Sequence, residues 1–196
     1  MGKYHLVLLY FSGLFLAEAL RLPQRIHHIR DRQAWHNVDH PARIADYFVL
    51  LSVVFGFWIL PIAYSFTSVL SAFDYCLSVW PIQIAIPLFL ISLIIRLIAQ
   101  MSLSRSWSST LETSNSHILV QNGIYSLSRH PIYVSLVLWA VAQPFLLHNY
   151  LVGVGGAVAV ILIWFVRVPR EERMMIDIFG EDYLDYMRRT GLFFPR

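Results

Sequence analysis

Five apolar runs, each close to the length needed to cross a bilayer, constrain this chain more than any other feature of its sequence. They cover residues 4–20, 44–66, 81–101, 132–147 and 150–166. A helix needs about 20 residues to cross about 30 Å of hydrocarbon. Since lipid offers no partners to backbone polar groups, a spanning segment is a helix or part of a closed barrel. We therefore predict an all-α integral membrane protein with about five transmembrane helices.

The overall composition agrees with a lipid environment. Of the 196 residues, 57% are hydrophobic, which is high for a soluble domain. The single cysteine, Cys76, excludes an internal disulfide, and its apolar neighbours predict a buried, unreactive thiol. We expect no cleavable signal peptide, because the run after Lys3 lacks a small-residue cleavage site. The first run is therefore expected to be a membrane helix.

The arginines fall in three intervals that belong on one side of the membrane. Five lie at about 21–43, two lie after the third apolar run, and six lie at residue 167 or beyond it. The positive-inside rule places these intervals in the cytoplasm, with the N-terminus outside and the C-terminus cytoplasmic. The basic charge is thus explained by topology, and we expect no nucleic-acid partner.

The end of the chain predicts a hairpin followed by a surface helix. Only His148 and Asn149 separate the last two apolar runs, so these two helices should pack antiparallel. Residues 171–189 place apolar side chains at helical spacing among charged ones, with an interruption at Gly180. This pattern indicates an amphipathic cytoplasmic helix. We expect two parts, 1–101 with three helices and the basic loop, and 102–196 as a functional core.

Two polar segments flank the predicted hairpin and should meet at its cytoplasmic end. In the first, residues 117–133, Arg129 and His130 precede Pro131, a residue that suits the first turn of a helix. A cation and an imidazole at a helix N-terminus would favour a bound anion. Alternatively, Arg129 is only a positive-inside anchor.

The second polar segment contains a possible ion pair at the membrane boundary. Arg167 and Glu171 share one helix face unless Pro169 breaks the turn between them. They could bind opposite charges of two ligands, or form a surface pair worth under about 1 kcal/mol. Glu18 and Arg96 are expected near the inner interface, where Arg96 can extend to water.

Histidines in the first loop raise the question of a metal. They are His27, His28, His36 and His40. His36 and His40 have a spacing similar to the histidine boxes of membrane di-iron enzymes, but such sites need several clusters. Since His5 and His148 are predicted on the opposite side, we expect no metal site. A titrating loop that faces lipid phosphates is the alternative interpretation.

Several motifs in order resemble one family of membrane enzymes, the isoprenylcysteine carboxyl methyltransferases. The motifs are His117-Ile118-Leu119-Val120, Gly123-Ile124-Tyr125, Arg129-His130-Pro131-Ile132-Tyr133, Arg167, Glu171-Glu172, and Phe179-Gly180-Glu181-Asp182-Tyr183 with Tyr186. The resemblance covers about residues 105–196. It implies a helical membrane fold that binds S-adenosylmethionine in a pocket facing the cytoplasm.

The resemblance also implies roles for individual residues. Arg167 is expected on the substrate side, and Arg167 and Glu171 are the expected catalytic residues. The expected cofactor-binding residues are His117, Ile118, Leu119, Val120, Tyr125, His130, Pro131, Ile132, Tyr133 and Glu171. The methyl acceptor is expected to be lipophilic and to arrive from the bilayer, so membrane lipids are the other expected partners.

Three functions stay open at this point. A carboxylate acceptor is ionised near neutral pH, so its O-methylation needs no general base. Arg167 would then hold the carboxylate through a bidentate contact, and Glu171 would take a polar or cationic group of the cofactor. N-methylation of a phospholipid or small amine would need a base such as His130. A small membrane scaffold without enzymatic activity is the third possibility.

Overall fold

The computed structural model describes residues 3–19, 40–76, 79–107 and 119–193, and within these ranges every named element is helical. The elements are α1 (Lys3–Ala19), α3 (His40–Val54), η2 (Phe55–Ile59), α4 (Leu60–Phe66), η3 (Ser71–Phe73), α5 (Val79–Trp107), η4 (Gly123–Ser126), α6 (Pro131–Leu147), α7 (Tyr150–Leu162), η5 (Ile163–Arg167), α8 (Val168–Phe179) and α9 (Glu181–Arg189). The η2 and η5 segments are π-helical. The predicted all-α class is confirmed.

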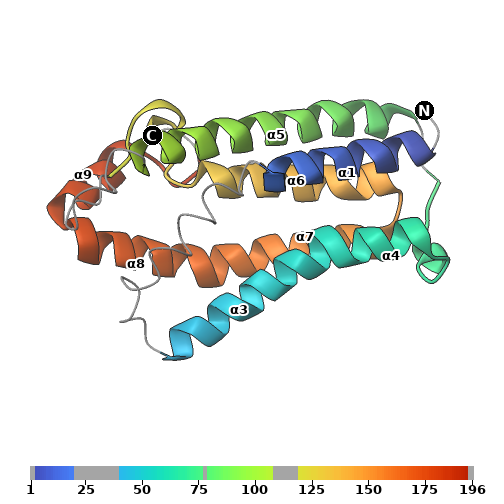
Figure 1. The fold of residues 1–196 in the computed structure, drawn as a ribbon, viewed down its shortest axis with the longest axis horizontal. Helices are drawn as coiled ribbons and strands as arrows, with labels where there is room; N and C mark the ends of the chain where they lie inside the picture. The colour runs from blue at the N-terminus through green and yellow to red at the C-terminus, as the bar shows by residue number, and fades with distance from the viewer. Residues whose placement is uncertain (1–2, 20–39, 77–78, 108–118, 194–196) are drawn as a thin grey trace.

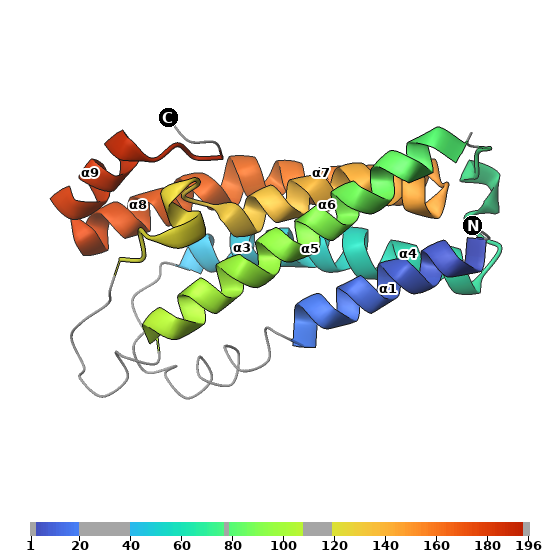
Figure 2. The same cartoon turned by 90° about the horizontal axis from the view of Figure 1, so that it is seen from above.

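The helices lie along one long axis, with α6 between two groups (Figures 1 and 2). Helices α5 and α1 pack on one side of α6, and α7 packs on another side. The continuous rod formed by α3, η2 and α4 packs against α7. Helices α6 and α7 run antiparallel, as the short connection between them predicts. This arrangement brings the start of α6 and the end of α8 to the same end of the molecule.

Three helical rods are long and apolar enough to cross a membrane, namely Ile44–Phe66, Trp80–Leu103 and Tyr150–Phe179. Two shorter apolar helices accompany them, Tyr4–Ala19 and Pro131–Leu147. Only 28% to 33% of the apolar windows of the long rods is buried, so most of their side chains face outward. Outward apolar side chains suit a lipid solvent, and the chain is an integral membrane protein.

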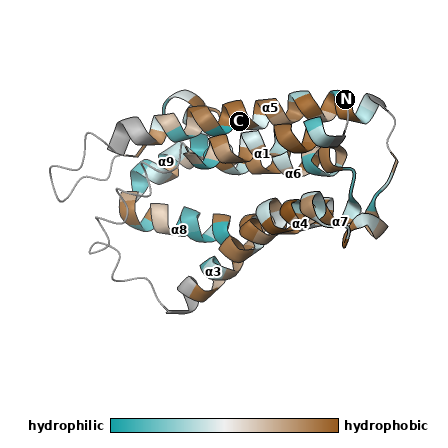
Figure 3. Ribbon diagram, turned by 45° about the vertical axis from the view of Figure 1, so that its right-hand side comes forward, coloured by the Kyte–Doolittle hydropathy of each residue, from teal (hydrophilic) through white to brown (hydrophobic). Residues whose placement is uncertain are grey.

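The hydrophilic residues gather on α8 and α9 at one end of the molecule (Figure 3). Helix α8 is not a separate surface helix that begins near residue 171, because it continues α7 through η5 without a break. The rod ends where the sequence predicted the interruption, at Gly180, whose φ of 54° favours glycine. Helix α9 then turns back toward η4 and the start of α6 (Figure 1).

Proline explains why two of the rods contain a π-helical turn. Pro169 has no N–H, so it cannot donate to the carbonyl four residues earlier. In η5 the backbone hydrogen bonds join residues five positions apart instead of four. The N–H of Val168, for example, donates to the carbonyl of Ile163. The helix therefore passes through Pro169, and Arg167 and Glu171 keep their shared face.

The same arrangement recurs at Pro61, two residues after η2, where another helix supplies the missing donor. Pro61 leaves the carbonyl of Phe57 without its usual helical partner. The hydroxyl of Tyr10 on α1 donates to that oxygen over 2.9 Å. Gln143 on α6 adds a second donor, with Nε2 bonding the carbonyls of Gly56 (2.9 Å) and Val152 (2.8 Å). These buried bonds tie α1, α6 and α7 to the π-helical turn.

A glycine contact lets η2 approach α7 closely. A Cβ atom on Gly56 would lie 2.3 Å from the carbonyl oxygen of Gly155, a backbone atom that cannot turn away. A Cβ on Gly155 would instead meet the end of the Leu60 side chain, also at 2.3 Å. Backbone approach of this kind is typical of small residues at membrane helix crossings.

Two expectations about single residues are wrong. Cys76 is exposed rather than buried, because it follows η3 in the connection between rods instead of lying within a helix. Arg96 does not extend to water: it is 6% exposed and lies 3.5 Å from Glu18 across the contact between α5 and α1. Of the loop histidines, His40 begins α3, whereas His27, His28 and His36 lie outside the described residues.

Candidate functional site

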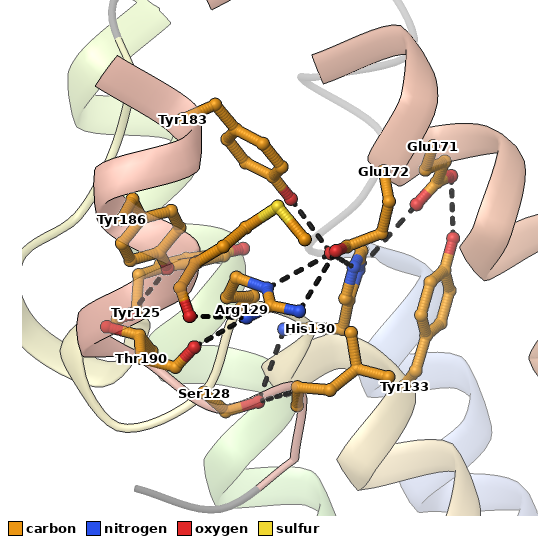
Figure 4. Close-up of polar contacts among 12 residues, drawn as sticks. Tyr125, Ser128, Arg129, His130, Tyr133, Glu171, Glu172, Tyr183, Tyr186 and Thr190 are labelled. Atoms are coloured by element: carbon orange, nitrogen blue, oxygen red, sulfur yellow. Dashed lines mark hydrogen bonds and ion pairs between the residues drawn. The ribbon is translucent and has the colours of Figure 1, made fainter. Parts of the chain in front are cut away.

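Four elements converge at the polar end of the bundle and form the candidate site (Figure 4). Tyr125 comes from η4, His130 and Tyr133 from the start of α6, two glutamates from α8, and two tyrosines from α9. The two polar segments that flank the hairpin therefore meet, as the sequence predicts. The α8 glutamates are Glu171 and Glu172, and the α9 tyrosines are Tyr183 and Tyr186.

Local sequence explains where α6 begins and how its first residues are placed. Pro131 is the first helical residue and His130 is the N-cap, as expected from the missing proline N–H. The hydroxyl of Ser128 accepts from the backbone N–H of His130 over 3.2 Å. Tyr133 lies one turn into the helix, and its ring stacks on His130 with centroids 5.3 Å apart.

Glu172 is the centre of a buried network. Its Oε1 accepts from His130 Nε2 (2.7 Å), Tyr183 OH (2.9 Å) and Arg129 Nε (3.1 Å). Its Oε2 accepts from Arg129 Nη2 over 2.9 Å. Three of these four donors converge on Oε1 and one is on Oε2, so the protein's own groups hold both oxygens of the carboxylate. Glu172 is therefore bound within the protein, with 12% of its side chain exposed.

Arg129 is a structural cation in this network. Besides its two contacts with Glu172, it donates through Nη1 to the carbonyls of Met187 (3.2 Å) and Thr190 (2.6 Å). Its side chain is 8% exposed, which excludes a role as an anchor in the headgroup region. The anion that the side chains of Arg129 and His130 bind is therefore the protein's own Glu172.

Glu171, the next residue to Glu172 in the chain, has a different environment. Tyr133 OH (2.6 Å) and Arg167 Nε (2.8 Å) both donate to its Oε1. Among the described residues, its Oε2 has only His130 Nδ1 nearby, at 3.8 Å, too far for a hydrogen bond. The Glu171 side chain is 28% exposed against 12% for Glu172. One oxygen of Glu171 is thus able to receive a donor from a ligand.

Arg167 is the most accessible charged group of the site, with 37% of its side chain exposed. Its pair with Glu171 has the predicted spacing of four residues, and Pro169 does not disrupt it. The contact with Glu171 uses one of the five guanidinium donors. Arg167 is therefore able to hold a second acceptor group such as a carboxylate.

The tyrosines outside the membrane rods stay neutral phenols. Burial raises the pKa of Tyr125, and burial together with the nearby Glu172 carboxylate raises the pKa of Tyr183. Burial also raises the pKa of Tyr186 to about 12. Tyr186 donates its hydroxyl proton to the carbonyl of Tyr125, which fixes α9 beside η4. The site is thus lined with neutral aromatic rings and one accessible carboxylate.

The C-terminal segment, residues 190–193, closes one side of the network. The carbonyl of Leu192 accepts from Ser128 Oγ over 2.8 Å, and the carbonyl of Gly191 accepts from the N–H of Arg129 over 3.1 Å. The ring of Phe193 stacks on Trp164 of η5, with centroids 3.9 Å apart. This segment and the role of Glu172 are absent from the sequence expectations, although the paired acids and the tyrosine tail were recognised.

The other predicted site residues are placed less centrally. Leu119 and Val120 are half-buried in the segment that leads into η4. Ile132 lies in the first turn of α6, and its carbonyl accepts a hydrogen bond from Ser135 Oγ over 2.6 Å. His117 and Ile118 lie outside the described residues. The ligand contacts of all these residues stay predictions.

Comparison with known proteins gives one family. The model of the isoprenylcysteine carboxyl methyltransferase (ICMT) family matches residues 85–177. The protein-S-isoprenylcysteine O-methyltransferase of Mus musculus is 41% identical over 83 residues, which are 41% of this chain and 29% of the mouse protein. The Saccharomyces cerevisiae protein of that name is 31% identical over 51% of this chain and 43% of its own length. Protein-S-isoprenylcysteine O-methyltransferase A of Arabidopsis thaliana is 31% identical over 55% of each chain.

These matches cover only part of each relative. The chain spans less than a third of the mouse protein and about half of the Arabidopsis protein. The matched region runs from within α5 through η4, α6, α7 and η5 into α8. It therefore contains Tyr125, His130, Arg167 and Glu171.

Proposed function

Because residues 85–177 match the model of the isoprenylcysteine carboxyl methyltransferase family, we propose that this chain is an S-adenosylmethionine-dependent methyltransferase of the membrane interface. Its proposed reaction is O-methylation of a carboxylate on a lipid-modified acceptor of the isoprenylcysteine type. The names of the relatives support this reaction. The acceptor and the reaction are proposals, since the matches cover part of each relative.

The observation that carries the proposal is the accessible oxygen of Glu171 beside Arg167. S-adenosylmethionine has a cationic sulfonium and an ammonium group, and both suit a site with a carboxylate and neutral tyrosine faces. Glu171 Oε2, without a hydrogen bond among the described residues, provides the acceptor for a cationic donor. Tyr125 and Tyr133 provide aromatic faces within the same site. The residues present therefore fit the cofactor.

When bound, S-adenosylmethionine would supply a methyl group activated by its sulfonium charge. In the proposed reaction Arg167 holds the acceptor carboxylate, which is already ionised and needs no base. The remaining work of the protein is to orient the two reactants and to exclude water. Arg167 and Glu171, held together by a 2.8 Å bond, place binding sites for opposite charges side by side.

N-methylation of an amine has less support from the site. A neutral amine acceptor would need a general base, and His130 was the candidate. In the structure His130 Nε2 contacts Glu172, and Nδ1 faces another carboxylate, Glu171. Nδ1 is the ring nitrogen left to accept a proton, and it lies beside the carboxylate that we propose for the cationic groups of the cofactor rather than for a methyl acceptor. The scaffold hypothesis gives no reason for the accessible carboxylate beside an arginine.

The proposed topology has five spans, which include the two shorter helices α1 and α6. It places the N-terminus outside, and the site, α9 and the C-terminus in the cytoplasm. The arginine distribution of the sequence supports this orientation. We further propose that the acceptor arrives between helices from the bilayer, and that residues 102–196 contain the functional core while residues 1–101 provide the other spans.

The experiment that tests the function is calorimetric titration of S-adenosylhomocysteine into detergent-purified protein. We expect binding in the wild type, and at least tenfold weaker binding in Glu171→Gln and Tyr125→Ala. Asp185→Asn is the matched control, because Asp185 pairs with Arg188 on the exposed face of α9. Methyl transfer to a farnesylcysteine analogue then tests the acceptor. Folded protein that does not bind S-adenosylhomocysteine contradicts the proposal.

A further inference from the structure

The neighbouring acids of α8 differ in what they can do for a ligand. Glu171 has an accessible oxygen, whereas Glu172 is 9% exposed and accepts hydrogen bonds from Arg129, His130 and Tyr183. A carboxylate that is buried and held in this way acts on a ligand through the groups that it holds. Of the three groups held by Glu172, His130 is the one that also faces Glu171.

The bond between His130 and Glu172 determines which ring nitrogen carries a proton. An ionised carboxylate only accepts, so His130 donates from Nε2 to Glu172 Oε1 over 2.7 Å. In the neutral imidazole Nδ1 is then an acceptor. That atom lies 3.8 Å from Glu171 Oε2, a second acceptor. Two acceptors side by side, without a donor between them among the described residues, are suited to a cationic N–H group.

We propose that Glu172 is a positioning residue, which holds His130 so that Nδ1 and Glu171 Oε2 together receive a cationic N–H donor of the ligand. This inference rests on the proposed function, in which that donor is the ammonium group of the cofactor's amino-acid part. Stacking of the imidazole on Tyr133 limits rotation of the ring, and Glu172 selects its tautomer.

Arg129 provides a control that distinguishes a structural role of Glu172 from a positioning role. Arg129 and Glu172 both belong to the network that holds α8, α9 and the C-terminal segment together, so a change at either should lower the melting temperature. Of these two residues, Glu172 is the one whose side chain bonds the ring of His130. In Arg129→Lys the positive charge beside Glu172 remains, while the two-nitrogen contact with Glu172 and the Nη1 contacts with Met187 and Thr190 are lost. That variant should leave the tautomer of His130 intact.

The test compares two ligands by calorimetry, S-adenosylhomocysteine and its analogue with hydrogen in place of the amino group. In the wild type the analogue should bind roughly tenfold to a hundredfold more weakly, as expected for a charge-assisted bond. In Glu172→Gln the two affinities should differ by less than about threefold. In Arg129→Lys the wild-type ratio should persist, despite a lower melting temperature.

Three results would overturn the inference while leaving the proposed function in place. They are equal binding of both ligands to the wild type, an unchanged ratio in Glu172→Gln, or a lost ratio in Arg129→Lys with S-adenosylhomocysteine still bound. Nitrogen NMR of histidine-labelled wild type provides a test that needs no stable Glu172 variant, with His130 assigned by its loss in His130→Asn. A ring protonated on Nε2 alone supports the proposal, and a proton on Nδ1 contradicts it. Absence of any binding of S-adenosylhomocysteine instead contradicts the proposed function.

Discussion

The hydroxyl of Tyr10 lies 2.9 Å from the carbonyl oxygen of Phe57, the group that Pro61 deprives of its helical N–H partner. Helix α1 thus supplies a hydrogen-bond donor to a carbonyl of η2 that lacks its helical partner. Both residues are buried, with Tyr10 fully inaccessible and Phe57 2% exposed. Water therefore cannot replace the phenol, and the contact should contribute measurably to stability.

Tyr10→Phe should destabilise the protein by about 1–2 kcal/mol, because it leaves a buried carbonyl without a donor. The matched background is Pro61→Ala, which restores an N–H at the position that could serve Phe57. In that background Tyr10→Phe should cost clearly less. Denaturation in detergent measures both effects, and equal costs in the two backgrounds would show that the hydroxyl does not act through the carbonyl of Phe57, leaving its 3.2 Å contact with Gln143 Oε1 as the source of the cost.

Gly56→Ala should disrupt the contact between η2 and α7 more than Gly155→Ala does. The new methyl group at position 56 meets the backbone of Gly155, whereas the one at position 155 meets the movable end of Leu60. We expect a loss of several kcal/mol, or failure to fold, for Gly56→Ala and about 1–3 kcal/mol for Gly155→Ala. Thermal unfolding of the two purified variants checks the order, and a more stable Gly56→Ala protein would contradict this account.

Arg167→Lys should lower turnover about a hundredfold while the affinity for S-adenosylhomocysteine changes by less than about threefold. Lysine preserves the charge near Glu171 but loses the planar fork that suits a carboxylate. Steady-state methylation of a farnesylcysteine analogue and calorimetry on the same preparation separate the two effects. Unchanged turnover would exclude Arg167 from acceptor binding.

Cys76 should report the orientation of the chain, because it is the single cysteine and is exposed after η3. In the proposed topology it faces the non-cytoplasmic side. A membrane-impermeant maleimide should label it in intact cells or spheroplasts and should fail to label it in sealed inverted vesicles. Cys76→Ser provides the background control, and the reverse pattern would invert the proposed topology.

The sequence predicts those features of this protein that depend on short stretches of chain. Pro131 begins α6 as its missing N–H requires, Gly180 ends α8, and Arg167 meets Glu171 one turn later. Each outcome follows from backbone rules within a few residues. The sequence pattern could not reveal that the π-helical turn η5 lets the helix continue through Pro169, since such a turn has no simple residue signature.

Features that join distant parts of the chain were not predictable in this way. Arg129 and Glu172 are 43 residues apart, and nothing local distinguishes Glu172 from Glu171 as the buried partner. The pair of Glu18 with Arg96 likewise depends on how α1 packs against α5. Hydropathy located both helices but contained no information on which faces meet.

The bonds from residues 190–192 to Ser128 and Arg129 have a consequence for biosynthesis. A ribosome produces all the apolar helices before this segment emerges, so the membrane bundle can insert while its polar end is still incomplete. Completion of the site then follows the insertion of these helices. A chain truncated near residue 180 would retain the apolar helices and yet lack the contacts that hold Arg129 in place.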